Sequence, residues 1–284
     1  MSSRYWEDLA RHEGGSAIEE IWLNHPLVRK EVNLRVSGDS SIWPTPWLRS
    51  QIQQLPLGLS IGCGTGAFER GIVAFNVVSR VIGIDRAWLP LQQAHRLAGE
   101  AKMSDRISYV QADAVEFLRH HRDRFDAIFF HASLHHFGDP RTLLQVVRSA
   151  LRPGGYLFFD EYVGPARNEW SVFRLLIPNV AYYLLPRRVR RPGLVRAPIN
   201  REDPTEAIAS SRIVPALHAT FEHVTTRPYG GNLLSIVYPN LHRPPANGVS
   251  SQLFDEAITR LIHFERVLMR FGFAPYFLVA LAQR

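Results

Sequence analysis

The chain has 284 residues with a net charge of +7, and 46% of them are apolar, enough to bury the core of one large domain. Its single cysteine, Cys63, excludes an internal disulfide, so we expect a reducing and cytoplasmic environment. No apolar run approaches about 20 residues, and residues 1–30 show no basic stretch followed by an apolar one, so neither a membrane span nor a signal peptide is predicted.

The first 50 residues are expected to form a helical cap on a main domain over residues 51–284. Apolar residues recur at helical spacing over 4–36 and predict two helices there. The stretch 37–47 is rich in turn-forming residues, prolines and tryptophans, and it predicts an ordered loop.

Short apolar runs alternate with helical patterns from Leu57 to residue 160. The predicted strands cover 57–61, 80–84, 107–110, 126–131 and 156–160. The predicted helices cover 67–76, 87–99, 114–121 and 140–150, and a Pro-Gly-Gly turn at 153–155 precedes the fifth strand. This alternation is typical of right-handed crossovers and of a parallel sheet with helices on both faces.

The pattern is less regular after the fifth strand. Residues 165–215 and 233–271 are expected to be largely helical, with a sixth strand over 221–227 and a final strand over 276–281. Segments that follow strands of a parallel sheet emerge at the carboxyl ends, where open α/β sheets bind ligands. We therefore expect 165–215 and 233–271 to form a helical lid over a ligand site.

Between the first strand and the first helix lies the sequence LSIGCGTGAFE, Leu59 to Glu69, with glycines at 62, 64 and 66. A strand, a tight turn and a helix start bring backbone N–H groups close to a nucleotide-like ligand. Glycine allows the positive φ of such a turn and removes Cβ atoms from the ligand's path. Taken alone, the pattern also fits an ordinary glycine-rich turn.

Two acidic residues follow the next strands. Asp85 ends the second strand, 23 residues after Gly62, where a carboxylate can accept hydrogen bonds from ribose hydroxyls. Asp113 follows the third strand, where it can accept from an adenine amino group or cap the helix that starts at Ala114. The sequence leaves these two roles of Asp113 open.

Taken together, these motifs resemble the class I S-adenosylmethionine-dependent methyltransferases. The resemblance covers about residues 57–161 and depends on LSIGCGTG, Asp85, ADA at 112–114, FDAIFFHASLHH and LRPGGYLFFDE in that order. It implies an α/β, Rossmann-like fold whose mostly parallel seven-stranded sheet has an antiparallel last strand. A nicotinamide dehydrogenase is the main competitor, because Gly62-x-Gly64-x-x-Ala67 also fits a dinucleotide fingerprint.

The resemblance also implies the cofactor, S-adenosyl-L-methionine, and the residues that hold it. Gly62, Cys63, Gly64 and Gly66 would line its methionine and ribose portion, and His131 would lie near the methionine end. The ribose would be held by Asp85, with Arg86 beside it, and the adenine edge by Asp113 and Ala114.

Three further motifs resemble a bacterial subgroup with EYVGP after the fifth strand, some members of which accompany glycan-biosynthesis enzymes. They are DEYVGPARNEW (160–170), DPTEAI (203–208) and RPYGGNLL (227–234); the subgroup's acidic residues after the Arg-Pro pair are absent at 192–197. The expected reaction is O-methylation of a sugar or another small polar metabolite. The alternatives are N- or C-methylation of a natural product, or a non-catalytic protein that binds the cofactor or a partner.

Methyl transfer to a hydroxyl needs a base near the acceptor, and the candidates follow the fourth and fifth strands. We favour His136, keep His135 as the alternative, and expect Glu161 to orient the base or the acceptor. Each of the three also has a structural alternative, such as a helix cap or a buried hydrogen bond. No metal is predicted, because His131 and His135 straddle a strand end and share no helical face.

Residues 182–196 combine aromatic side chains with five arginines. We expect Arg187, Arg188, Arg190 and Arg191 to contact phosphate or an anionic surface, although a solvated charged segment fits the pattern equally well. No nucleic-acid-binding module accompanies the charge, so no specific nucleic-acid partner is expected.

Overall fold

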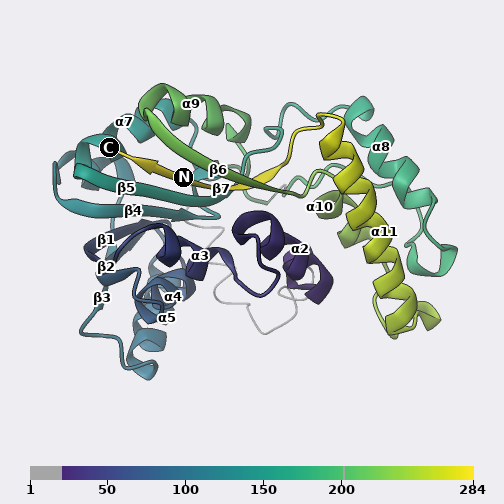
Figure 1. The fold of residues 1–284 in the computed structure, drawn as a ribbon, viewed down its shortest axis with the longest axis horizontal. Coiled ribbons are helices and arrows are strands. Elements are labelled where there is room, and N and C mark those ends of the chain that lie inside the picture. Colours follow the sequence, from purple (N-terminus) through teal and green to yellow (C-terminus); the bar gives the residue numbers. More distant parts are fainter. Residues whose placement is uncertain (1–20, 201) are drawn as a thin grey trace.

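The computed structural model describes residues 21–200 and 202–284, and its centre is a seven-stranded sheet of order β3-β2-β1-β4-β5-β7-β6 (Figure 1). The first five strands run parallel, and β7 runs antiparallel to both β5 and β6. The strands are β1 Leu55–Ile61, β2 Val78–Asp85, β3 Ile107–Gln111, β4 Phe125–His131, β5 Leu151–Tyr162, β6 His223–Gly230 and β7 Phe277–Gln283. The expected Rossmann-like fold with an antiparallel last strand is confirmed.

Helices cover both faces of the sheet, each over its own buried core (Figure 1). One face carries α6 Ala114–Arg119, α7 Pro140–Ala150 and α9 Ile213–Thr220; the other carries α2 Pro26–Ser37, α3 Pro44–Gln51, α4 Ala67–Ala74 and α5 Trp88–Glu100. Helix α7 shows how the sequence sets such an element. Its Asp139 Oδ1 accepts from Thr142 N, Pro140 takes the first helical position, and its apolar stripe is buried.

A group of helices lies beyond the carboxyl ends of the strands (Figure 1). It contains α8 Val172–Tyr183, α10 Leu234–Val237 and α11 Ser251–Arg270. Short 3-10 helices complete the chain: η2 Trp22–Asn24, η3 Leu134–His136, η4 Arg187–Val189, η5 Ser210–Arg212, η6 Tyr238–Asn240 and η7 Ala246–Gly248. Among the described residues, none of the helices combines the length and apolarity that a membrane span requires.

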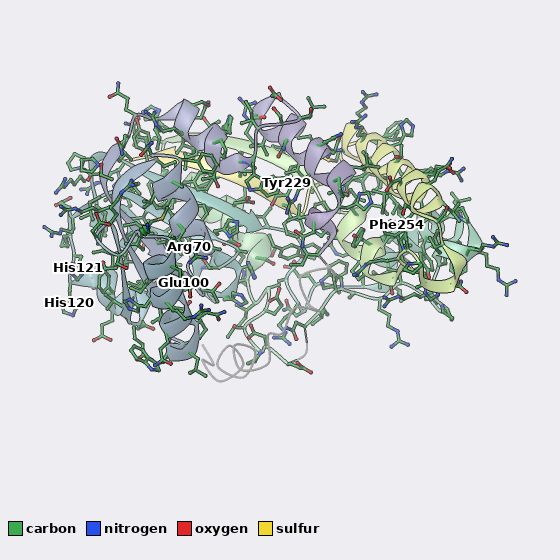
Figure 2. The ribbon with its side chains drawn as sticks, turned by 90° about the horizontal axis from the view of Figure 1, so that it is seen from below. Arg70, Glu100, His120, His121, Tyr229 and Phe254 are labelled. Carbon is green, nitrogen blue, oxygen red and sulfur yellow. The ribbon has the colours of Figure 1, made fainter. Side chains whose placement is uncertain are left out.

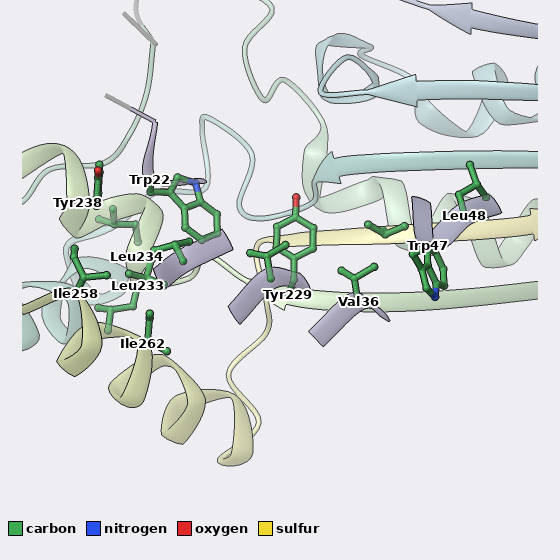
Figure 3. Close-up of a cluster of buried hydrophobic side chains, with 14 of the residues drawn as sticks. Trp22, Val36, Trp47, Leu48, Tyr229, Leu233, Leu234, Tyr238, Ile258 and Ile262 are labelled. Carbon is green, nitrogen blue, oxygen red and sulfur yellow. The ribbon is translucent and has the colours of Figure 1, made fainter. Parts of the chain in front are cut away.

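Tyr229 of β6 lies between the sheet and this helical group. In Figure 2 it stands between Arg70 of α4 and Phe254 of α11. The close-up shows it between the side chains of Val36 and Trp47 and a larger set packed around Leu233 (Figure 3). One continuous apolar core therefore joins the helical group to one face of the sheet.

The structure differs from the predicted elements at several places. Helix α9 buries Ile213 and Leu217 on the sheet, so this part of the expected lid segment 165–215 belongs to the main domain. Strand β5 already pairs at Leu151 and resumes at Tyr156, so the predicted turn interrupts a longer strand rather than preceding it. The first of the two helices predicted over 4–36 falls mostly on residues outside the described ranges.

Candidate functional site

A cavity of about 640 Å³ opens at the carboxyl ends of β1, β2 and β4. This is where a parallel sheet changes its direction of winding and where such folds bind ligands. Predicted cofactor residues that line the cavity are Gly62, Cys63, Gly64, Asp85, Arg86, Asp113, Ala114 and His131. The one predicted cofactor residue outside this lining is Gly66.

The glycines of the turn have different structural roles. Gly62 has φ +71°, and a Cβ there would lie 2.7 Å from the Cβ of Ser133, so glycine permits β4 to end against β1. Gly64 has φ +51° with no atom within 4 Å of its would-be Cβ, so glycine leaves the cavity open at this point. A side chain at 64 would be strained and would enter the ligand space.

The expectation that Gly66 lines the cofactor portion is not met. With φ +76°, its would-be Cβ would lie 2.1 Å from Oη of Tyr109, whose hydroxyl donates to Gly66 O at 3.4 Å. Glycine is needed here because Tyr109 of β3 packs against the turn. Gly66 contributes to the cavity indirectly, because it lets the turn pack over the side chain of Tyr109.

Asp85 and Asp113 combine structural and cavity roles. Asp85 Oδ2 accepts from Gly64 N and Oδ1 from Ala87 N, both at 2.9 Å, so its carboxylate fixes the turn across the cavity floor. Asp113 Oδ1 caps α6 by accepting from Val115 N at 3.0 Å and Glu116 N at 3.1 Å. Its Oδ2 lies 3.6 Å from Arg86, so Asp113 both caps the helix and borders the cavity.

Carboxylates dominate the charge of the cavity. Besides Asp85 and Asp113 the lining holds Glu69, which is fully buried, and burial raises the pKa of Glu69 to about 7. Arg86 is the single arginine or lysine among the lining residues. The cavity therefore suits a cationic ligand better than a diphosphate.

His131 forms a wall of the cavity together with an aromatic side chain that the sequence analysis missed. The ring of Phe68, from the first turn of α4, stacks on His131 with centroids 4.9 Å apart and planes 15° apart. A lone phenylalanine at the start of a helix carries no pattern that distinguishes a cavity wall from core packing.

His135 and Glu161 form a buried ion pair behind the cavity rather than part of its lining. His135 Nδ1 lies 2.7 Å from Glu161 Oε2, and Nε2 lies 3.7 Å from Glu206. Burial alone would lower the pKa of His135, but the Glu161 charge and hydrogen bond, with help from Glu206, raise it to about 10. His135 is therefore a cation at neutral pH and has no free lone pair to act as a base.

Glu161 also anchors the turn that carries both histidines. Its Oε1 accepts from Ser133 N at 2.5 Å and from Leu134 N at 2.6 Å, at the start of η3. The carboxylate thus pairs with buried N–H groups at the helix start, which have no partner within the helix. Through these bonds Glu161 positions the β4–η3 turn rather than the EYVGP loop.

His136 is the histidine of the pair that lines the cavity. Its Nδ1 lies 3.1 Å from Thr205 Oγ1 and 3.4 Å from Asp203 Oδ2. Burial and the neighbouring His135 charge lower the pKa of His136 below its usual value. His136 is therefore neutral at pH 7 and can accept a proton.

Comparison with known proteins places this arrangement in a family. Residues 59–159 match the family model described as a methyltransferase domain. The tRNA (carboxymethyluridine(34)-5-O)-methyltransferase of Schizosaccharomyces pombe is 30% identical over 183 residues, which cover 62% of this chain and 74% of that protein. The chain belongs to the class I S-adenosylmethionine-dependent methyltransferases.

Other relatives match this chain over a shorter stretch or at lower identity. The ubiquinone biosynthesis O-methyltransferase of Shewanella sp. (strain ANA-3) is 31% identical over 102 residues, 36% of this chain and 42% of that protein, so the match spans less than half of that relative.

Two solved structures share the fold. Phosphoethanolamine N-methyltransferase 2 of Haemonchus contortus has a TM-score of 0.51 and 17% identity, covering 98% of this chain and 59% of its own. Geranyl diphosphate C-methyltransferase of Streptomyces coelicolor A3(2) has a TM-score of 0.52 and 14% identity, covering 100% and 99%.

The sequence analysis missed the segment that closes over the histidines of this methyltransferase-family chain. Asp203, Thr205 and Glu206 all contact His135 or His136, and Thr205 and Ile208 line the cavity. These residues lie almost 70 positions from the histidines, so no spacing rule connects them. The DPTEAI motif at 203–208, through its resemblance to the subgroup, was the one indication in the sequence that this segment has a role.

Ligand atoms of His135, His136 and Glu206 lie within 4.8 Å of one another, a spacing that a metal ion can bridge. His135 is held as a cation between two carboxylates, however, and a histidine must lose its proton before it can bind a metal. The absence of a metal stays a prediction, which metal analysis of the purified protein tests.

Proposed function

We propose that this protein is an S-adenosylmethionine-dependent methyltransferase whose cofactor occupies the cavity beneath the glycine turn. The observation that carries the proposal is a nucleotide-type turn opening, at Gly64, into a cavity lined by three acidic side chains. S-adenosylmethionine carries a sulfonium and an ammonium cation, which such a lining stabilises. In the proposal, Asp85 holds the ribose hydroxyls and Asp113 borders the adenine.

The same charges argue against the nicotinamide dehydrogenase that the glycine pattern allowed. A dinucleotide brings a doubly anionic pyrophosphate to this turn, and that group is stabilised by N–H donors and cations. Here the described lining holds a single arginine and no lysine, and that arginine, Arg86, is already paired with Asp113.

His136 is the proposed general base. The cofactor supplies an electrophilic methyl group, and a hydroxyl acceptor gains nucleophilicity as its proton passes to the neutral imidazole. Thr205 and Asp203 orient the ring from its Nδ1 side. His135 and Glu161 act as positioning residues, since they hold the turn that presents His136.

The proposed acceptor is a hydroxyl of a sugar or another small polar metabolite. Support comes from a neutral base on the cavity wall, which can take the proton that a hydroxyl must lose as the methyl group is transferred. Two of the relatives are named O-methyltransferases, one of ubiquinone biosynthesis and one of a carboxymethylated tRNA uridine.

The proposal is tested by incubating purified protein with methyl-labelled S-adenosylmethionine and cell extract, then identifying the labelled product. We expect label on an oxygen of a small molecule and formation of S-adenosylhomocysteine. Label on nitrogen or carbon would overturn the acceptor assignment. Cofactor binding without label transfer to any fraction would favour the non-catalytic alternative.

A further inference from the structure

Helix α8 has an exposed apolar face in place of the polar face that a surface helix normally shows. Phe173 is 84% exposed, Val172 78% and Leu176 62%, and Val180 and Leu184 follow on the same side at helical spacing. The opposite side, which includes Ala181 and Tyr182, is buried against the rest of the protein. An unbroken apolar face of this size on a surface helix indicates an interaction site.

Arginines surround the end of this face. Arg187, Arg188 and Arg191 are exposed in the segment directly after α8. That segment is fastened to the helix, because Val195 N donates to Asn179 Oδ1 at 2.9 Å and Asn179 Nδ2 donates to Val195 O at 3.1 Å. These bonds hold the backbone of the arginine-bearing segment to α8.

The fourth predicted arginine, Arg190, has a different role. Its guanidinium lies over the ring of Tyr183 at 4.8 Å from the centroid and over that of Tyr182 at 5.8 Å. Arg190 thus connects the segment to the helix end through cation–π contacts. We expect the other three arginines to make the anionic contacts.

Charge in this region has one sign. Residues 170–200 hold six arginines and no aspartate, glutamate or lysine, while the whole chain has a net charge of +7. Leu194, 65% exposed, adds a further apolar side chain among the arginines. Apolar side chains next to exposed arginines are the pattern of a helix that lies in the headgroup region of a membrane.

We propose that α8, together with Leu194 and the arginines of 187–191, docks the protein on an anionic phospholipid bilayer. The helix has 12 residues and a length of about 18 Å, so it would lie in the plane of the interface rather than cross it. Phe173 and Leu176 enter the acyl boundary, and the arginines contact lipid phosphates.

Charge complementarity favours a bilayer over a second copy of this chain. A symmetric dimer through this face would gather the exposed arginines Arg187, Arg188 and Arg191 of both copies at one interface with no acidic residue of 170–200 to pair them, and like charges at an interface oppose association. An anionic bilayer supplies the opposite charge and an apolar phase together. A phosphate-bearing solute would satisfy the arginines but leave the apolar face in water.

The test measures flotation of the full-length protein with vesicles of phosphatidylcholine alone or with phosphatidylglycerol. We expect binding to the anionic vesicles, weakening at high salt, and little binding to phosphatidylcholine. The triple variant Arg187→Ser, Arg188→Ser, Arg191→Ser should bind on the order of 100-fold more weakly. Its charge-matched control replaces Arg119, Arg122 and Arg124, which are exposed elsewhere, and should bind like the wild type.

The apolar face is tested with Phe173→Ser combined with Leu176→Ser. The matched control is Phe75→Ser with Ile42→Ser, since these side chains are also exposed but lie outside α8. We expect only the α8 variant to leave the vesicles, with melting temperatures and S-adenosylhomocysteine affinity unchanged in both.

Three results would overturn the proposal. They are equal binding to neutral and anionic vesicles, no binding to either, and equal loss in the α8 variants and their controls. Sedimentation without lipid gives an independent measurement. A wild-type dimer that Phe173→Ser and Leu176→Ser dissociate would identify the face as a self-association surface instead.

Discussion

The cofactor cavity and the α8 surface have opposite character in one basic chain. The cavity is concave and lined by Glu69, Asp85 and Asp113, whereas α8 is convex, apolar and flanked by arginines. The chain's net charge of +7 agrees in sign with the surroundings of α8 and does not indicate the acidic lining of the cavity. We therefore expect the ligand preference of each region to follow the charges that line it rather than the total charge of the chain.

Two buried glutamates each hold the start of a short helix, one beside the cavity and one within the helical group. Glu161 accepts from Ser133 N and Leu134 N at the histidine turn, and Glu265 accepts from Leu233 N at 2.9 Å and Leu234 N at 3.1 Å at α10. Glu161 is paired with the cationic His135, whereas Arg35 lies 4.0 Å from Glu265 and burial raises the pKa of Glu265. Both glutamates thus accept hydrogen bonds from backbone N–H groups, but Glu161, beside the cavity, has a stronger charge partner than Glu265.

The largest expected effect is on catalysis. Replacing His136 by Asn removes the proposed base and should lower turnover by about 10²–10⁴, with S-adenosylhomocysteine affinity unchanged. Because the pKa of His136 is lowered, the wild-type rate should rise with pH through a value below about 6.5. The control is His120→Asn, labelled in Figure 2, which ends α6 and is not among the residues that line the cavity. Turnover within threefold of wild type in the His136 variant would make this histidine structural.

The next effect is on stability and separates the two glutamates. Glu161→Gln removes the closer of the two carboxylates that face the buried His135 cation and should lower the free energy of unfolding by about 3–5 kcal/mol. Glu265→Gln should cost about 1–2 kcal/mol, because the amide oxygen of Gln can still accept from both N–H groups at the start of α10, and Arg35, the one charged partner among the described residues, lies 4.0 Å away. Urea unfolding at pH 7 measures both values.

The pH dependence of this pair has a definite sign. The pKa of His135 is higher in the folded state, so its stabilisation is fully present below about 6.5 and is lost as pH rises through about 10. The difference between wild type and Glu161→Gln should therefore shrink above pH 10. A difference that is equal for both glutamates, or constant with pH, would contradict the ion-pair account.

A further effect on stability concerns the connection between the sheet and the helical group. Tyr229 donates to Asp160 Oδ1 at 2.6 Å and stands between the sheet and the helical group (Figure 3). Tyr229→Phe should lower the free energy of unfolding by about 1–3 kcal/mol while the transition stays single and cofactor affinity holds. Tyr156→Phe, at a partly exposed position, should change little. Two separate transitions in the Tyr229 variant would show that the regions unfold independently.

The sequence predicted the sheet well because its evidence was local. Strands β1 to β4, the glycine turn and Asp85 follow from short apolar runs and the residues that end them. Gly66 was assigned to the cofactor because a left-handed glycine looks the same whether a ligand or Tyr109 requires it. The predicted start of β5 missed Leu151, since the strand continues across an irregularity that no short pattern encodes.

Tertiary partners could not be predicted. His135 and His136 were equivalent in sequence, and only their surroundings make one a buried cation and the other a neutral cavity residue. Those surroundings come from Glu161 and from 203–206, which are distant in the chain. Helical periodicity likewise finds an apolar face on α8 but cannot tell that it is exposed.

Calorimetric titration with S-adenosylhomocysteine and with NAD tests the central claim most directly. The account predicts binding of S-adenosylhomocysteine, no binding of NAD, and loss of binding in Gly64→Val, whose side chain would enter the cavity. Gly38→Val is the matched control, since Gly38 also has a positive φ and open surroundings but ends α2 outside the cavity. Binding of NAD in place of S-adenosylhomocysteine, or wild-type affinity in folded Gly64→Val, would contradict the account.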